Sequence, residues 1–263
     1  MKELLVDSGS DPEEQPTITG VLLENNKKVM ADKVIVATGG ISYASTGSTG
    51  DGYRFASETG HKLVECKPSL VPFNVKENWC KDAMGVSLKN VSLRLVCGKK
   101  EIYSGFGEML ITHFGISGPL ALSASSYYVS KSKGETIAYI DLKPALDAEQ
   151  LDKRVLRDFE ENMNKKFKNA IGKLFPTKLI PIMLELSGID PDKKVNAISK
   201  EERRQLGFLL KYLTMHVSGL RDYKEAVITK GGISVKEITE HICEIEGVND
   251  VHHIHLRTLD GHN

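Results

Sequence analysis

The sequence predicts an α+β protein with three parts: an α/β portion that carries a ligand-binding turn, an antiparallel β-barrel or sandwich, and a small helical domain. Three observations lead there. An apolar run at 34–36 opens into a turn that holds five glycines between residues 39 and 52. Alternating apolar and polar residues then dominate up to residue 142. Helical periodicity with capping residues follows from 147 to about 220.

The apolar run and its glycine turn point to a nucleotide cofactor. Three consecutive aliphatic residues at 34–36, typical of a buried strand in a parallel sheet, predict a strand over 33–37. Glycines let main-chain N–H groups approach a phosphate or a ring closely. A helix is expected over 52–59, ending at Gly60. The plainer alternative is a tight turn that binds nothing.

The elements around this turn follow from local patterns. Segments 17–24 and 28–32 alternate and are joined by Asn25-Asn26, which predicts a β-hairpin. Pro68 and Pro72 mark the exit from this first portion. Alternation over 86–96 and 135–142, with glycines between, predicts the antiparallel barrel or sandwich.

Two capping signals open the helical part. Asp147 and Ser199 occupy N-cap positions, and Gln150 and Glu202 follow each by three residues, as in a capping box. His216 is expected to pack internally or to end a helix. Each helix has one apolar face: Leu151, Val155, Leu156, Phe159 and Met163 on the first, and Leu206, Leu209, Leu210 and Leu213 on the second.

Four ordered motifs together resemble one family. They are 37–53, with ATGG at its start and TGSTGDGY at its end, 68–72 (PSLVP), 112–119 (THFGISGP) and 229–235 (TKGGISV). They are similar to the HI0933-like flavoproteins, FAD-dependent oxidoreductases that include aminoacetone oxidases and some bile-acid reductases. The resemblance implies FAD as cofactor, NAD(P)H as a reductant and a small-molecule substrate, whose identity the sequence does not fix.

The resemblance also implies a domain plan. Residues 1–67 and 222–238 would form part of a Rossmann-like FAD-binding domain. The β-barrel (68–146) and the helical domain (147–221) would be inserted into it. The return strand is expected over 226–229, just before the last motif.

Candidate site residues come from the same motifs. His113 is a weak candidate for a general acid, because imidazole titrates near neutrality, although a lone histidine is more often structural. A plain turn is the alternative for every glycine. The cofactor-binding candidates are Thr38, Gly39, Gly40, Tyr43, Thr46, Gly47, Ser48, Thr49, Gly50, Asp51, Gly52, Gly231 and Gly232.

Two departures from the family pattern bear on activity. These 263 residues contain no Gly-x-Gly-x-x-Gly turn, the element that places an FAD pyrophosphate on a helix N-terminus. We therefore expect weak FAD binding by this chain, and a truncated or fused reading frame. Residues after about 238 resemble instead the start of the cytoplasmic domain of cation diffusion facilitators.

This tail offers an alternative function. His252, His253 and His255 are weak candidates for metal ligands, since a zinc site needs three or four and a strand would turn His253 away from its neighbours. The alternative to an oxidoreductase is a non-catalytic module whose histidine tail binds a divalent ion weakly.

Bulk composition sets the remaining expectations. Thirty-five Lys and Arg balance thirty-five Asp and Glu, so no global field favours nucleic acid, and none is expected as a partner. Apolar runs are too short for a membrane span, and no signal-type segment opens the chain, so a cytoplasmic location is expected. The four cysteines form no Cys-x-x-Cys pair, which favours reduced thiols.

Overall fold

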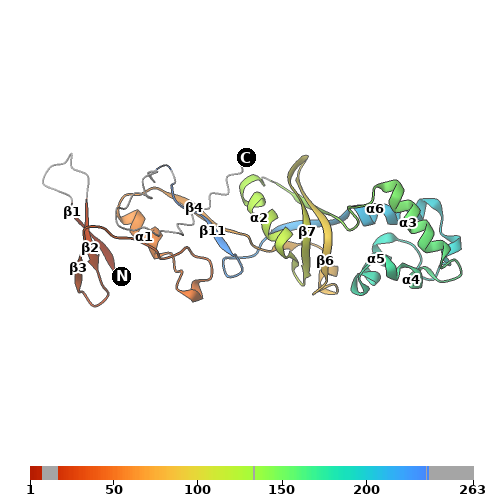
Figure 1. The fold of residues 1–263 in the computed structure, drawn as a ribbon, viewed down its shortest axis with the longest axis horizontal. Coiled ribbons are helices and arrows are strands. Elements are labelled where there is room, and N and C mark those ends of the chain that lie inside the picture. The colour runs from red at the N-terminus through yellow and green to blue at the C-terminus, as the bar shows by residue number, and fades with distance from the viewer. Residues whose placement is uncertain (8–16, 133, 235, 237–263) are drawn as a thin grey trace. The chain divides into compact units, whose positions relative to one another are not determined.

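The computed structural model describes residues 1–7, 17–132, 134–234 and 236. They form two compact units, coloured along the chain in Figure 1. The turn unit comprises residues 1–67 and those from 227 on, and the barrel unit comprises residues 68–226. The chain thus leaves the turn unit near Pro68 and returns to it near the last motif.

The turn unit contains two small sheets and a helix. The strands β1 (Glu3–Asp7), β2 (Thr17–Leu22) and β3 (Lys28–Met30) form an antiparallel sheet in that order. This confirms the hairpin around Asn25-Asn26, where Asn26 has a φ of 62°. The helix α1 (Asp51–Glu58) begins one residue before the predicted helix. The strand β4 (Leu63–Ser69) pairs with the return strand β11 (Ile228–Ile233).

The predicted strand at 33–37 is wrong. This segment has no strand assignment and pairs with none of the described strands. Ile35 is 74% exposed, whereas the parallel-sheet reading required burial on both faces. An apolar run becomes a strand only where a neighbour accepts its ladder hydrogen bonds, and the part of the chain described here supplies none.

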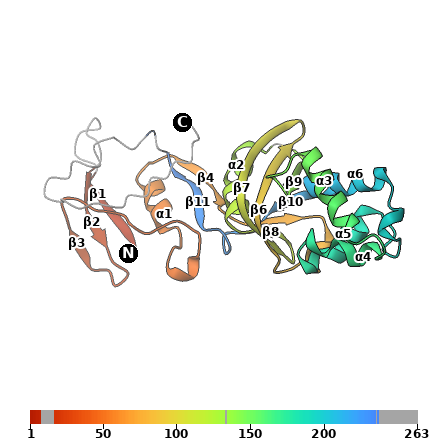
Figure 2. The ribbon, with the colours of Figure 1, turned by 45° about the vertical axis from the view of Figure 1, so that its right-hand side comes forward.

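The barrel unit is built on a closed antiparallel barrel, as predicted (Figure 2). On β6, Leu93 and Leu95 are buried while Arg94 between them is exposed, which is the alternation of a strand with one face in the core. The strand order is β10 (Leu213–Leu220), β5 (Phe73–Val75), β8 (Gly115–Ser117), β7 (Lys100–Thr112), β6 (Ser87–Cys97) and β9 (Thr136–Asp141).

Two elements of this unit were not predicted correctly. Residues 213–220 form β10, which closes the barrel between β5 and β9, and do not extend a helix. Leu213, Met215 and Val217 are buried in alternation, a period of two that the preceding helical pattern hides in the sequence. The helix α2 (Pro119–Lys131) was missed, because its small residues give little periodicity; it packs against β7.

The helical part shares the core of the barrel. Both predicted capping boxes are confirmed: the backbone N–H of Gln150 donates to Asp147 Oδ1 at 2.8 Å, and that of Glu202 donates to Ser199 Oγ at 3.2 Å. One continuous cluster of buried side chains joins barrel strands and helices. The helices are α3 (Ala148–Glu160), α4 (Phe167–Ala170), α5 (Ile180–Ser187) and α6 (Lys200–Lys211), with single 3-10 turns among them.

None of the helices in the described residues has the length and apolar character to cross a membrane.

Candidate functional site

The predicted cofactor turn has the backbone of a folded loop. Gly39, Gly47 and Gly50 take φ values of 69°, 97° and 84°, in the left-handed region that favours glycine. Tyr43 adopts φ 53° and caps a 3-10 turn at Ala44–Thr46. Glycine is thus required by conformation at three of the predicted positions, whatever the turn binds.

Thr229 joins this turn to the return strand. The backbone N–H of Ile41 donates to Thr229 Oγ1 at 3.2 Å, and the hydroxyls of Ser42 and Thr229 share a hydrogen bond of 3.0 Å. A Cβ on Gly40 would lie 2.8 Å from Thr229 Oγ1, so glycine is needed for this approach. Two motifs that stand almost 190 positions apart in the sequence therefore meet in one place.

The return strand uses its two glycines for close packing. A Cβ on Gly231 would collide with the backbone of Glu65 on the neighbouring β4, and one on Gly232 would lie 2.9 Å from the ring of Tyr53. Both have positive φ values. These glycines hold β11 against β4 and α1, which accounts for them without a ligand.

The N-terminus of α1 already carries a negative charge. Gly50 is its N-cap, and Asp51 lies in the first turn, where the helix dipole stabilises its negative charge. The Thr49 hydroxyl donates to Asp51 Oδ2 at 3.0 Å, and Arg54 lies 3.8 Å from the same carboxylate. Asp51 is thus the first residue of the helix and not its N-cap, and a second anion at this terminus would meet its carboxylate.

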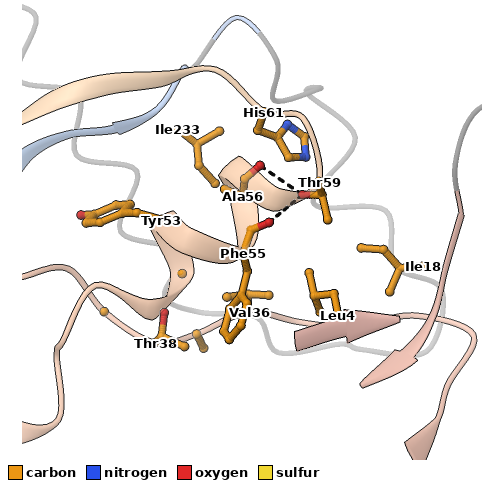
Figure 3. Close-up of a pocket in the computed structure, with 13 residues that line it drawn as sticks. Leu4, Ile18, Val36, Thr38, Tyr53, Phe55, Ala56, Thr59, His61 and Ile233 are labelled. Carbon is orange, nitrogen blue, oxygen red and sulfur yellow. Dashed lines mark hydrogen bonds between the residues drawn. The ribbon is translucent and has the colours of Figure 1, made fainter. Parts of the chain in front are cut away.

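A mainly apolar cavity of about 270 Å³ lies beside the turn (Figure 3). Leu4 and Ile18 face it from β1 and β2, Phe55 from α1, and Thr59 from the C-cap of that helix. Of the predicted site residues, the cavity includes Thr38, Gly39 and Gly52. Sequence reasoning did not name the remaining lining residues as site candidates: Leu4, Ile18, Val36, Ala37, Tyr53, Phe55, Ala56, Thr59, His61 and Ile233.

The residues that line the cavity fit one portion of FAD, its planar ring system. The cavity lies just below the range of about 300–1,000 Å³ that is usual for small-molecule sites, so it suits a planar ring better than a whole dinucleotide. Gly39 and Gly52 bring the backbone of the turn to its wall, and β11 reaches it through Ile233. Within the described residues the pyrophosphate has no comparable place, since the sequence lacks the Gly-x-Gly-x-x-Gly turn and Asp51 occupies the α1 terminus.

The weak catalytic candidate lies in the other unit. His113 is exposed in the turn between β7 and β8, with its ring edge-on to Phe114 at 4.9 Å between centroids. Its motif has a structural explanation. A Cβ on Gly115 would collide with the Phe73 carbonyl, and Gly118, at φ 87°, precedes the first residue of α2. His113 as a general acid stays a prediction.

Two buried hydroxyls of the family motifs lack hydrogen-bond partners among the described residues: Ser69 Oγ and Thr112 Oγ1.

The residues that the structure describes contain no group of three or more His, Cys, Asp or Glu side chains that could hold a metal ion. His252, His253 and His255 lie outside the described residues, as does the whole segment that resembles the cation diffusion facilitators.

The profile of a protein family described as "HI0933-like protein barrel and H2TH domain" matches residues 67–228, well over half of the chain. The chain belongs to the HI0933-like family. The match covers the barrel and all the helices of the barrel unit, and it begins and ends at the boundaries of that unit to within two residues.

The alignments with named relatives extend beyond this domain. A ribosomal RNA dihydrouridine synthase of Haemophilus influenzae is 30% identical over 89% of this chain, and one of Escherichia coli is 25% identical over 90%. A 3-dehydro-bile acid delta(4,6)-reductase of Clostridium scindens is 28% identical over 83%. The aligned regions are 56%, 57% and 54% of those proteins, so the chain spans about half the length of the curated relatives it matches.

Proposed function

We propose that this HI0933-like chain belongs to an FAD-dependent reductase of a carbon–carbon double bond conjugated to a carbonyl, with uracil in ribosomal RNA as its substrate and NAD(P)H as the reductant. The contact between the predicted cofactor turn and the return strand carries the proposal. The hydrogen bonds of Thr229 to Ile41 and Ser42 bring together two of the segments expected to bind the flavin.

The names of the relatives support one reaction type. Dihydrouridine is uridine with two hydrogen atoms added across the ring double bond, which is conjugated to a carbonyl. A delta(4,6)-reductase of a 3-dehydro compound likewise reduces double bonds conjugated to a carbonyl. In both reactions one carbon of the conjugated system receives a hydride. A proton is then added to the neighbouring carbon, or to the equivalent carbon one double bond further along the conjugated system.

The protein's own contribution would be positioning. A bound FAD would supply the hydride, as flavins do in such enzymes. The backbone at 38–40, the turn at 46–52 and Gly231-Gly232 would hold the flavin portion, and the apolar lining from Phe55, Val36 and Ile233 would exclude water from it. Because no pyrophosphate turn is present in the sequence, we expect the affinity of these 263 residues for FAD to be low.

We favour RNA over a steroid as the substrate because two relatives, each aligned over about nine-tenths of this chain, are named ribosomal RNA dihydrouridine synthases. The test is to incubate the chain with excess FAD, NADPH and ribosomal RNA, and to digest the RNA for mass spectrometry of its nucleosides. A delta(4,6) 3-oxo steroid serves as the comparison substrate. We expect dihydrouridine and no reduced steroid; reduction of the steroid alone would contradict the RNA assignment, and reduction of neither would contradict the reductase.

A further inference from the structure

The exposed side of α6 carries cations and aromatic rings in regular order. Lys200, Arg204, Phe208 and Tyr212, called here the α6 stripe, follow one another at four-residue intervals and are all exposed. Residues four apart are neighbours on a helix surface. Phe208 is 63% exposed, which is unusual for so large an apolar ring, while Leu206 and Leu210 hold the opposite face in the core.

The aromatic end of the stripe is a stacked surface. The rings of Phe208 and Tyr212 lie 4.8 Å apart at an interplanar angle of 33°, and Tyr139 on β9 meets Tyr212 edge-on at 6.5 Å. Tyr139 pairs in register with Arg94 on β6, and both side chains lie on the outer face of the barrel. Figure 2 shows α6 running into β10, beside β9. The rings therefore continue from the helix onto the barrel.

The charged end of the stripe is positive, and its two cations are available to bind an anion. Neither Lys200 nor Arg204 forms an ion pair with any residue that the structure describes. The carboxylates nearby are accounted for: Asp152 binds Arg203 through both oxygens, and Glu101 binds Arg94. Glu201 is exposed on the adjoining side of α6.

We propose that the α6 stripe, continued by Tyr139, binds unpaired RNA. Single-stranded nucleic acid is recognised by cations that follow its phosphates and by aromatic side chains on which its bases stack. The stripe presents both kinds of group in sequence along α6 and its C-cap residue, Tyr212. This inference rests on the proposed function, because RNA is the substrate there. This proposal departs from the expectation, drawn from the balanced net charge, that the chain has no nucleic-acid partner, because a net charge does not describe local surfaces such as this one.

Fluorescence anisotropy of a labelled single-stranded oligouridine on the 263-residue chain tests the proposal without flavin. We expect saturable binding at low salt and weaker binding to an RNA duplex, whose base faces are hidden. Phe208→Ala should weaken binding roughly tenfold or more, Phe208→Leu nearly as much, and Phe208→Trp little or not at all. Arg204→Gln should lower the slope of log affinity against log salt by about 0.7, the value for one lost phosphate contact.

Two variants serve as matched controls. Tyr127 on α2 is 39% exposed, the same fraction as Tyr212, and lies under Lys131 at 5.0 Å, so Tyr127→Ala removes a comparable ring beside a cation elsewhere. Lys153→Gln removes an exposed cation of α3. Both should bind as the unaltered chain does. Circular dichroism checks that each variant folds, which the exposure of Phe208 leads us to expect.

The outcomes separate this proposal from the proposed function. No binding to oligouridine, wild-type affinity in Phe208→Ala and Arg204→Gln, or equal losses in the controls would overturn the stripe as an RNA surface. Binding that depends on the stripe, in a protein that reduces no uridine, would leave the surface standing and overturn only the reductase. Reduction of RNA with an unchanged KM in Phe208→Ala would do the reverse.

Discussion

Single side chains join parts of this chain that are far apart in sequence. Thr229 connects the return strand to the glycine turn through Ile41 and Ser42. Arg203 on α6 binds Asp152 on α3 with two hydrogen bonds, of 2.7 Å and 3.0 Å. Each contact depends on one side chain whose distant partner no local pattern indicates, so each is a point at which a substitution can report on the fold.

The Asp152–Arg203 pair predicts a pH dependence of stability. The hydrogen bond from Arg203 holds the pKa of Asp152 below its usual value, with smaller contributions from nearby positive charges. A carboxyl whose pKa is lowered on folding stabilises the folded state above its unfolded pKa, and this contribution is lost as the pH falls through the folded pKa. Urea unfolding from neutral to acid pH should show a smaller loss of stability for Asp152→Asn than for the unaltered chain. Parallel curves would contradict this.

Cys80 should be the least reactive thiol of the described residues. Its side chain is buried, and desolvation, with the charge of Glu77 adding to it, raises the pKa of the thiol to about 12. The thiolate is the reactive form, so alkylation at neutral pH requires unfolding. Iodoacetamide labelling followed by peptide mass spectrometry should modify the partly exposed Cys97 first. Equal rates at Cys80 and Cys97 in the folded protein would show that Cys80 is accessible.

At the scale of elements, the joint between β8 and α2 depends on glycine. Gly118 has a φ of 87°, and a Cβ there would lie 3.0 Å from Leu110 N and from Met109 Cα. Gly118→Ala should therefore destabilise the protein by more than about 1 kcal/mol, which exceeds the stabilisation that Gly→Ala gives at an unstrained position. Gly98→Ala is the matched control, because Gly98 has a φ of 59° but open space around it. Denaturant unfolding should show a smaller loss for Gly98→Ala; equal losses would mean that backbone strain alone accounts for the effect.

Elements with strong local signals were predictable from the sequence. The capping boxes at Asp147 and Ser199 and the alternation of β6 and β9 each come from residues within one element. The failures depend on partners. The predicted strand at 33–37 has no neighbouring strand among the described residues, and 213–220 is a strand because β5 and β9 flank it. Sequence patterns record burial, but strand pairing is decided by segments elsewhere in the chain.

The candidate site was predictable only in part, for the same reason. Family motifs marked Thr38, Gly39 and Gly52, which line the cavity. Leu4, Ile18 and Phe55 carry no motif, because any apolar side chain of suitable size can line a cavity wall, and their convergence depends on the fold. The bonds of Thr229 to the turn could be expected only as a neighbourhood, through the resemblance, and not as particular contacts.

At the scale of the whole molecule, the barrel unit has a core of its own. Its strands and helices share one continuous cluster of buried side chains, and the family profile covers the same residues. A fragment of residues 68–226 should therefore fold alone and unfold cooperatively, with the midpoint that this unit has in the longer chain. Hydrogen exchange of the same amides in both proteins measures this. A fragment that fails to protect the β6 and β9 amides would show that the barrel needs the turn unit.

The joining of the glycine turn to β11 as one flavin-binding face is the central claim, and flavin titration tests it most directly. FAD absorbance and fluorescence would be followed with the 263-residue chain, with Thr229→Val, with Thr229→Ser and with residues 68–226 alone. We predict weak but saturable binding by the unaltered chain, retained in Thr229→Ser, which keeps the hydroxyl, reduced in Thr229→Val and absent in the fragment. Equal binding by the fragment, or no effect of Thr229→Val, would contradict the claim.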